Sequence, residues 1–237
     1  MTNLSTYFDK GNFYDTSDGN ITVARLQAGD IAYTNTGRIS LPPSPLIDYK
    51  GASATTTDIT VDVPSHEEGD IFVMVYVSWV RLITGYTGWT QQVHTELLSN
   101  DWFDVYTRVA TASEPASYTF TCTGSAYSHS AMIACFRGFS SIGTVAFNNK
   151  TPQETPSVTG TDGGLYVGMA GNIADSVSMA SGITGLTLVG VQEEAGANKS
   201  RVCIAYKQLT AAGATGAFTP TWGAMQYDGY AGIPLNV

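Results

Sequence analysis

The sequence predicts an all-β protein: a pseudo-symmetric antiparallel β-sandwich, jelly-roll-like and made of two similar halves, preceded by an extended N-terminal arm. Short apolar or alternating runs are separated by Gly, Pro, Asn, Asp and Ser, which is typical of strands joined by turns. Stripes with the 3.6-residue period of a helix are missing, and only the stretch around Glu96–Leu98 fits a helical turn. The pattern of the first half also recurs weakly in the second.

Residues 1–45 form the predicted arm. Two short strands are expected in it, Ile21–Leu26 and Ile31–Thr34, before closely spaced prolines at residues 42–45 impose an extended link. The segment is too aromatic for a disordered tail and too short to hold a core alone. We therefore expect it to serve attachment and oligomerisation by packing on a neighbouring subunit. Its candidate assembly residues are Tyr7, Phe8, Phe13, Tyr14 and Tyr33.

Residues 46–237 form the predicted sandwich, and its strands follow one another steadily. Ile59–Val63 alternates between apolar and polar residues and stops at Pro64. Ile71–Trp79 is apolar on both faces, as expected for a central strand. Further strands are predicted at Trp89–Thr95, Asp104–Ala110, around Tyr118–Cys122 and at Ser130–Phe136.

Two half-repeats, at about 58–140 and 155–237, give the sandwich its predicted symmetry. The stretch "GDIFVMVYVS" at Gly69 is echoed by "GGLYVGMAGN" at Gly163, and "FDVYTRVAT" by "VCIAYKQLT", at an offset of about 95–100 residues. Each half contains roughly six strands, which is the usual size of one sheet. Two such sheets packed face to face, about 10 Å apart, would bury both apolar faces. We therefore expect one sandwich rather than two independent domains.

Composition excludes several classes of function. The net charge of −9 and the lack of a Lys/Arg cluster exclude nucleic acid as a partner. Only 13% of residues are charged, so the surface is largely Thr, Ser, Asn and Gly, which suits packing against copies of the same chain. The N-terminus lacks the features of a signal peptide, and the apolar run Ile71–Val80 is too short to span a membrane. We expect synthesis in a bacterial cytoplasm and no membrane insertion.

A set of short motifs occurs in a distinctive order from about residue 58 to the C-terminus. These motifs are Gly69–Asp70, Gly88–Trp89–Thr90, Tyr106–Ala110 with Arg108 at its centre, Glu114–Tyr118, Arg137–Gly138 and Gly163–Leu165. In this order they resemble a domain that recurs in the virion proteins of tailed bacteriophages. The resemblance implies a β-sandwich carried on tail fibres, head fibres or capsid decorations, without a catalytic site. The N-terminal arm lies outside the resemblance, so attachment to head or tail stays open.

The residues that carry chemistry are scattered, and we predict no catalytic, cofactor-binding or metal site. His66, His94 and His129 stand singly and are expected at the surface or in turns. The three cysteines, Cys122, Cys135 and Cys203, are expected to be buried and free, with a Cys122–Cys135 bridge as the alternative. The acidic pairs Glu67/Glu68, Asp101/Asp104 and Glu193/Glu194 lie at turns or strand ends, where solvated acids are ordinary.

Aromatic residues predicted at turns or strand ends are the better functional signal, because sugars and protein partners both contact such side chains. The candidate contact residues for a glycan or a partner are Tyr86, Trp89, Trp102, Tyr127, Trp222 and Tyr227. Trp79 and Tyr230 share this kind of position, and some of the set is expected to cap the core.

These observations lead to a non-enzymatic structural protein of a phage virion, exposed on the head or tail. Its expected partners are copies of itself, a trimer by analogy with fibres and decorations, and other virion proteins. A host receptor- or glycan-binding module is the alternative, with host-surface polysaccharide as its ligand. A glycan-cleaving enzyme is a third and weaker reading.

Overall fold

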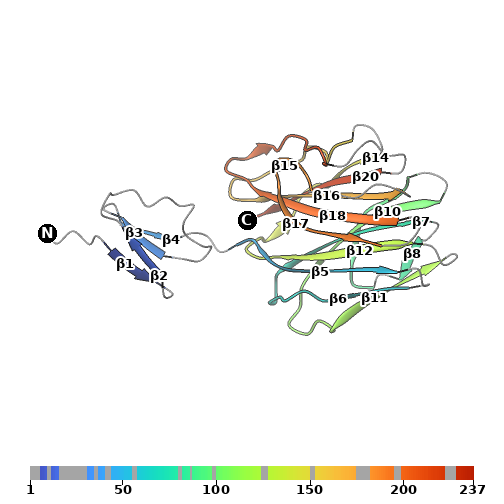
Figure 1. Ribbon diagram of the computed structural model, residues 1–237, viewed down its shortest axis with the longest axis horizontal. Helices are drawn as coiled ribbons and strands as arrows, with labels where there is room; N and C mark the ends of the chain where they lie inside the picture. The colour runs from blue at the N-terminus through green and yellow to red at the C-terminus, as the bar shows by residue number, and fades with distance from the viewer. Residues whose placement is uncertain are drawn as a thin grey trace. The chain divides into compact units, whose positions relative to one another are not determined.

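The computed structural model describes most of the chain, and its described regular elements are β-strands (Figure 1). The described residues are 6–9, 12–15, 31–34, 37–40, 44–54, 58–79, 82–85, 87–97, 100–123, 128–149, 153–174, 182–194, 199–221 and 228–237. The chain divides into two compact units, Met1–Pro45 and Leu46–Val237, at the same residue pair as the predicted boundary. In the described part we find no helix long and apolar enough for a membrane crossing.

The first unit contains two antiparallel strand pairs. β1 (Thr6–Asp9) pairs with β2 (Asn12–Asp15), and β3 (Ile31–Thr34) pairs with β4 (Gly37–Ser40). β3 confirms the strand predicted at these residues, whereas the predicted strand Ile21–Leu26 lies outside the described residues. The described part of this segment therefore consists of short paired strands, one of which the sequence predicts.

The second unit contains two large antiparallel sheets, and the first comes from its N-terminal half. Across this sheet the strands are β5 (Leu46–Ala54), β12 (His129–Phe136), β7 (Ile71–Trp79), β10 (Asp101–Val109) and β9 (Thr90–Glu96). β7 lies in the middle and is buried along almost its whole length, which confirms the prediction of a central strand. The helical turn expected around Glu96 is wrong, because this residue ends β9.

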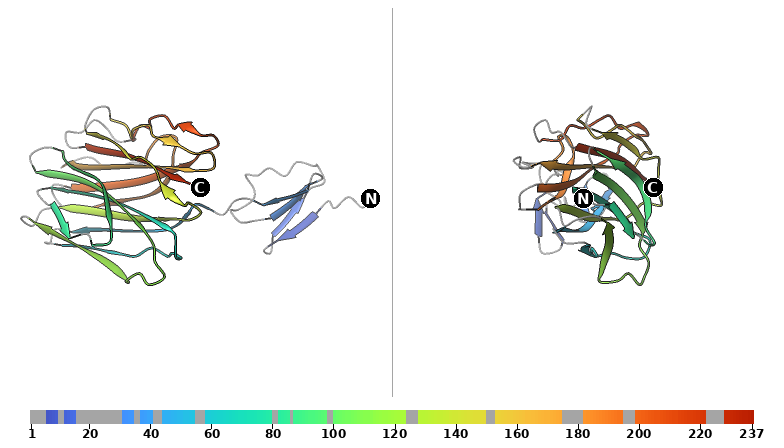
Figure 2. Two further views of the ribbon diagram at one scale, coloured as in Figure 1. Left: turned by 180° about the vertical axis from the view of Figure 1, so that it is seen from behind. Right: turned by 90° about the vertical axis from the view of Figure 1, so that its right-hand side faces the viewer.

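The second large sheet comes from the C-terminal half of the same unit. Across this sheet the strands are β13 (Ser141–Ile142), β20 (Asp228–Asn236), β16 (Leu165–Ala174), β18 (Lys199–Gln208) and β17 (Thr187–Glu193), and β14 (Ala146–Asn149) also pairs with β20. Figure 2 shows both sheets from behind and end-on, with blue to yellow-green strands in the first and yellow to red strands in the second.

One hydrophobic core lies between the two sheets. It contains Val73, Val75 and Val77 of β7 together with Val167 and Met169 of β16. The alternation of these residues along each strand places them on one face, as a pleated sheet requires. The two halves therefore share a single interior, which confirms the predicted face-to-face arrangement.

The outer faces of both sheets are covered as well, which the sequence does not predict. A three-stranded sheet of β6 (Ile59–Asp62), β11 (Ser117–Thr123) and β8 (Leu82–Gly85) covers the first sheet and forms a second core with it. The short strands β15 (Thr159–Gly160) and β19 (Gly213–Ala214) pair with each other, and the segments that contain them lie beside the second sheet. The prediction of one sheet per half is therefore wrong: the first half divides its strands between a central sheet and a cover sheet.

The two central sheets have the same strand order. In chain order, the fourth, first, third and second strands lie side by side both in β12-β7-β10-β9 and in β20-β16-β18-β17. Val75 of β7 is in register with Val105 and Met132, and Met169 of β16 is in register with Ile204 and Ala231. The common order fits the predicted half-repeats. A true internal symmetry and a jelly-roll topology stay predictions.

Candidate functional site

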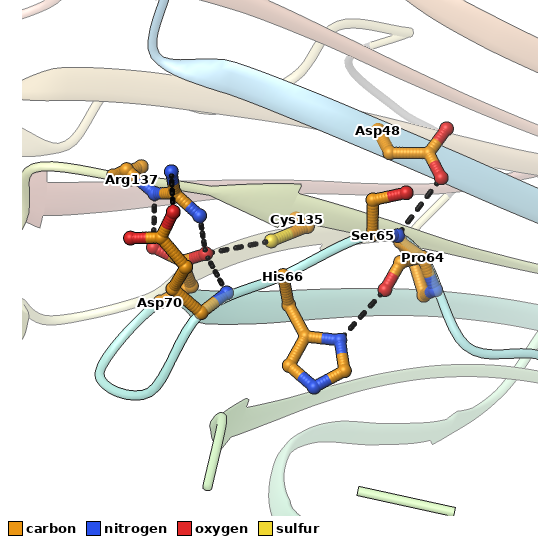
Figure 3. A network of polar contacts seen from close by, with 8 residues as sticks. Asp48, Pro64, Ser65, His66, Asp70, Cys135 and Arg137 are labelled. Atoms are coloured by element: carbon orange, nitrogen blue, oxygen red, sulfur yellow. Dashed lines mark hydrogen bonds and ion pairs between the residues drawn. The ribbon is translucent and has the colours of Figure 1, made fainter. Parts of the chain in front are cut away.

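An ion pair joins two central strands of the first sheet (Figure 3). Asp70 directly precedes β7 and Arg137 directly follows β12, and the antiparallel pairing of these strands brings the two residues together. The Arg137 Nε and Nη2 atoms donate to the Asp70 carboxylate at 2.9 and 2.8 Å, and the Glu67 backbone N–H donates to it at 2.7 Å. We call this arrangement the Asp70–Arg137 clamp.

The electrostatics of the clamp favour an ionised carboxylate and a protonated thiol. Asp70 is only 4% exposed, and burial works to raise its pKa. The hydrogen bonds from Arg137 and from the Glu67 backbone outweigh burial, so the pKa of Asp70 lies below its usual value. Burial and the nearby Asp70 carboxylate raise the pKa of the Cys135 thiol. A protonated thiol is a poor nucleophile, so this cysteine is structural.

The three cysteines are all buried and free. This confirms the prediction of small buried side chains and excludes the alternative of a Cys122–Cys135 bridge. Burial alone raises the pKa of Cys203 to about 12.

A second ion pair lies at the end of β10. The Arg108 Nε lies 3.2 and 3.1 Å from the two carboxylate oxygens of Glu114, and Arg108 Nη1 donates to the Gly88 carbonyl at 2.8 Å. The Thr111 N–H and the Tyr118 hydroxyl also donate to Glu114. We call this arrangement the Arg108–Glu114 clamp.

The buried Glu114 carboxylate is held strongly in its charged form. Burial opposes ionisation, but the hydrogen bonds from Tyr118, Thr111 and Arg108 together lower the pKa of Glu114 to about 2. Burial and the hydrogen bond to Glu114 raise the pKa of Tyr118 above its usual value. A carboxylate with a low pKa and occupied oxygens is unsuited to act as a general acid or base at neutral pH.

The two clamps contain the residues of the sequence motifs. Asp70 and Arg137 come from the first and fifth motifs, and Gly88, Arg108 and Glu114 come from the three between them. Gly88 has a φ of +81°, and a Cβ atom on it would lie 2.1 Å from the Arg108 Nη1 atom. The motifs therefore hold strand ends and turns in place.

The histidines occupy three different environments. His66 lies in the turn before β7, as predicted, and its Nδ1 is 2.9 Å from the Pro64 carbonyl oxygen (Figure 3). The prediction for His129 is wrong: it is fully buried, with its Nδ1 3.3 Å from the Tyr76 hydroxyl. His94 lies on β9, an outermost strand of its sheet, and its Nδ1 is 2.5 Å from the Asp104 carboxylate.

The acidic pairs also differ from one another. Glu67 and Glu68 are exposed in their turn, as predicted. Asp101 and Asp104 are buried rather than solvated, and burial raises the pKa of Asp104 to about 6 although its bond to His94 acts in the opposite direction. The Glu193 carboxylate, at the end of β17, forms ion pairs with Lys199 and Arg201.

Sequence reasoning missed a polar cluster inside the second half. Asn172 and Tyr230 both donate to the Asp228 carboxylate, and all three residues are fully buried. Burial raises the pKa of Asp228. Asn172, a polar residue inside the apolar run of β16, is the sequence signal that could have revealed this cluster.

The candidate contact residues that the structure describes differ in their exposure and surroundings. Trp89 is only 6% exposed and Tyr230 is fully buried, so the expected exposure of both is wrong. Trp102 is half-buried and stacks on His94, with ring centroids 4.7 Å apart and an interplanar angle of 9°. Trp79 packs against the core between the sheets. The remaining predicted contact residues, Tyr86, Tyr127, Trp222 and Tyr227, lie outside the described residues.

Trp89 nevertheless lines a small hollow beside the cover sheet. The hollow has a volume of about 200 Å³. Its lining residues are Gly85, Thr87, Trp89, Tyr118, Thr119, Phe120 and Thr121. We call it the Trp89 hollow. Sequence reasoning identified only Trp89 among these residues, because the others come together through the pairing of β8 with β11.

The predicted assembly residues lie on strands of the first unit. Tyr7 and Phe8 of β1 are in register with Tyr14 and Phe13 of β2, and Tyr33 lies on β3. Their role in assembly stays a prediction.

The described residues include no group of three or more His, Cys, Asp and Glu side chains placed to hold a metal ion. In comparisons with known proteins, no protein-family model, no curated protein and no solved structure matches this chain.

Proposed function

We propose that the chain is a non-enzymatic structural protein of a bacteriophage virion, exposed on the head or tail surface and anchored by residues 1–45. In this proposal residues 46–237 form the displayed body. Copies of the chain and other virion proteins are the partners, with a trimer as the expected assembly.

The observation that supports the proposal most is the use of the motif residues. The motifs that resemble phage virion proteins supply Asp70, Arg108, Glu114 and Arg137, and these side chains are engaged with one another in the two clamps. Residues that hold strand ends together serve the rigidity of a displayed body. The carboxylates of Asp70 and Glu114 already accept hydrogen bonds and have lowered pKa values, so they are poorly suited to act as catalytic acids or bases.

A body covered on both outer faces also suits this role. Each central sheet has one face in the shared core and the other against a further cluster of buried residues. The central strands are therefore buried on both faces, which favours a rigid particle component over a protein that opens around a substrate.

Deleting residues 1–45 from the chain in the phage that encodes it tests the anchoring role. We expect residues 46–237 to keep a β-sheet circular-dichroism spectrum and a cooperative thermal transition, and purified particles to lack the protein by mass spectrometry. A full-length variant with Tyr7, Phe8, Phe13, Tyr14 and Tyr33 changed to Ser should be absent from particles as well. Incorporation of the truncated chain at the normal level would refute the proposal.

A further inference from the structure

A buried carboxylate in the first sheet is joined to an outermost strand through one histidine. Asp104 lies on β10, in register with Tyr76 of β7 and His94 of β9, and it is fully buried. Its Oδ1 atom lies 2.5 Å from the His94 Nδ1 atom, and its Oδ2 atom has no hydrogen bond to another described residue. The carboxylates of the two clamps each accept hydrogen bonds from several donors. The burial of Asp104 is therefore compensated far less well.

The titratable groups packed around Asp104 come from each neighbouring strand. They are His94 of β9, Tyr106 of β10 and Tyr76 of β7, with His129 of β12 and Cys122 of β11 in contact with the Tyr76 hydroxyl. Burial raises the pKa of Asp104 to about 6, although His94 and Tyr106 act in the opposite direction. In the folded state this carboxyl group therefore binds a proton more tightly than it does in water, where its pKa is 3.8.

Strand β9 is attached to the body from one side. In the described part of the chain, β10 is its only neighbouring strand. Besides the backbone ladder, Gln91 donates to the Tyr106 hydroxyl at 3.1 Å and Gln92 to the Thr107 hydroxyl at 2.8 Å, and Val93 belongs to the shared core. A strand with one neighbour separates from its sheet more easily than a central strand such as β7.

His94 connects the buried carboxylate with water. Its side chain is 32% exposed, whereas the Asp104 side chain is fully buried. The imidazole stacks on the Trp102 ring, with centroids 4.7 Å apart, and this contact holds it beside the carboxylate. A proton can therefore pass between water and the pair through the imidazole while the sheet stays closed.

We propose that β9 is a proton-controlled edge strand: proton uptake by the His94–Asp104 pair holds it on β10, and proton loss loosens it. Without the proton, the folded state keeps an ionised carboxylate away from water, and opening of β9 lets water reach it. Because the closed state binds the proton more tightly than the open state, opening becomes more favourable as the pH rises from about 4 through about 6. Opening would also uncover the backbone edge of β10, with which a strand of another chain could pair.

The inference concerns residues 46–237 and does not depend on a role in a virion. Hydrogen–deuterium exchange of the full-length protein, followed by mass spectrometry of peptides that cover Thr90–Glu96, measures the opening of β9. After correction for the intrinsic pH dependence of exchange, we expect the opening constant to rise roughly 10- to 30-fold between pH 4.5 and pH 8. At every pH, β9 should open more often than the central strand β7.

Asp104→Asn removes the titrating group and keeps its shape, so the opening of β9 should lose this pH dependence. Glu96→Gln is the matched control, because it removes an exposed carboxylate from β9 itself and should keep the dependence. A ¹³C NMR titration of the Asp104 carboxyl group needs no variant and should give a midpoint near pH 6.

Three results would overturn the inference. The first is an Asp104 midpoint below about 5, which is close to the value of an exposed carboxyl group. The second is an opening constant of β9 that does not change with pH, or that changes equally in Asp104→Asn and Glu96→Gln. The third is exchange of β9 that is no faster than that of β7, because the strand would then not open by itself.

Discussion

At the scale of single residues, two arginines explain why several short motifs occur together in this chain. Arg137 bridges to Asp70 across 67 positions of sequence, and Arg108 holds Glu114 and the Gly88 carbonyl at the end of β10. Each clamp loses its function when one partner is changed, so the motif residues are expected to occur together. The motifs could be recognised from the sequence, but their pairing could not, because strand order decides which residues meet.

Breaking the Asp70–Arg137 clamp should destabilise the protein measurably. Asp70→Asn removes the charge of a carboxylate that is 4% exposed, and we expect the free energy of unfolding to fall by roughly 2–3 kcal/mol. Urea titration followed by circular dichroism measures the change. Glu67→Gln is the control, because the Glu67 side chain is 72% exposed and its pair with the same arginine should contribute less than about 1 kcal/mol. Equal losses in the two variants would contradict the account.

The Arg108–Glu114 clamp should make stability depend on pH in the acidic range. The pKa of Glu114 falls from 4.5 to about 2 on folding, so the folded state binds this proton more weakly than the unfolded state. The stabilisation is present above pH 4.5 and is lost as the pH falls toward 2, by at most about 3 kcal/mol.

Urea unfolding of the unchanged protein and of Glu114→Gln between pH 2 and pH 7 isolates this contribution, because the other carboxylates are common to both proteins. We expect the two stability curves to lie farthest apart above pH 4.5 and to converge as the pH falls from 4.5 toward 2. A constant difference across the range would show that Glu114 acts through packing rather than through its charge.

At the scale of elements, glycines set how closely the two central sheets approach. Gly171 of β16 and Gly229 of β20 are in register, and Phe103 of β10 packs on both from the opposite sheet. A Cβ atom would lie 2.7 Å from the Phe103 ring at Gly171 and 2.4 Å from it at Gly229. A glycine inside a strand pattern predicts a close approach, but the sequence does not tell which residue approaches.

Gly229→Ala should therefore destabilise the sandwich by about 1–3 kcal/mol through overpacking against Phe103. Chemical unfolding measures the loss. Adding Phe103→Leu to Gly229→Ala should recover part of it, although Phe103→Leu alone is destabilising. Strictly additive losses in the double variant would contradict the contact between the two sheets.

The strands themselves were largely predictable from the sequence, whereas the layers were not. Ile71–Trp79 has the uninterrupted apolar run of a strand buried on both faces, and Ile59–Val63 alternates as a half-buried strand should. The second layer over the first sheet could not be predicted, because alternation in β6 and β11 shows that one face is buried without showing against what. The same reason explains the wrong prediction of an exposed Trp89. A residue beside a turn is expected to be exposed, and the sequence does not show that β11 packs over it.

At the scale of the whole molecule, one shared core joins two halves with the same strand order. The core draws residues from both central sheets, and the order β12-β7-β10-β9 recurs as β20-β16-β18-β17. In the proposed role, this sandwich would have to be stable before assembly and would display its loops and edges to partners. Residues 1–45 form a separate compact unit, which suits a body and its anchor with different tasks.

Locating the chain in electron cryomicroscopy images of the purified phage particle tests the central claim most directly. We expect density that fits residues 46–237 on the outer surface of the head or tail, with the density that leads from Leu46 into the particle occupied by residues 1–45. The account would be contradicted by intact particles that contain none of this chain in their density and in their protein composition.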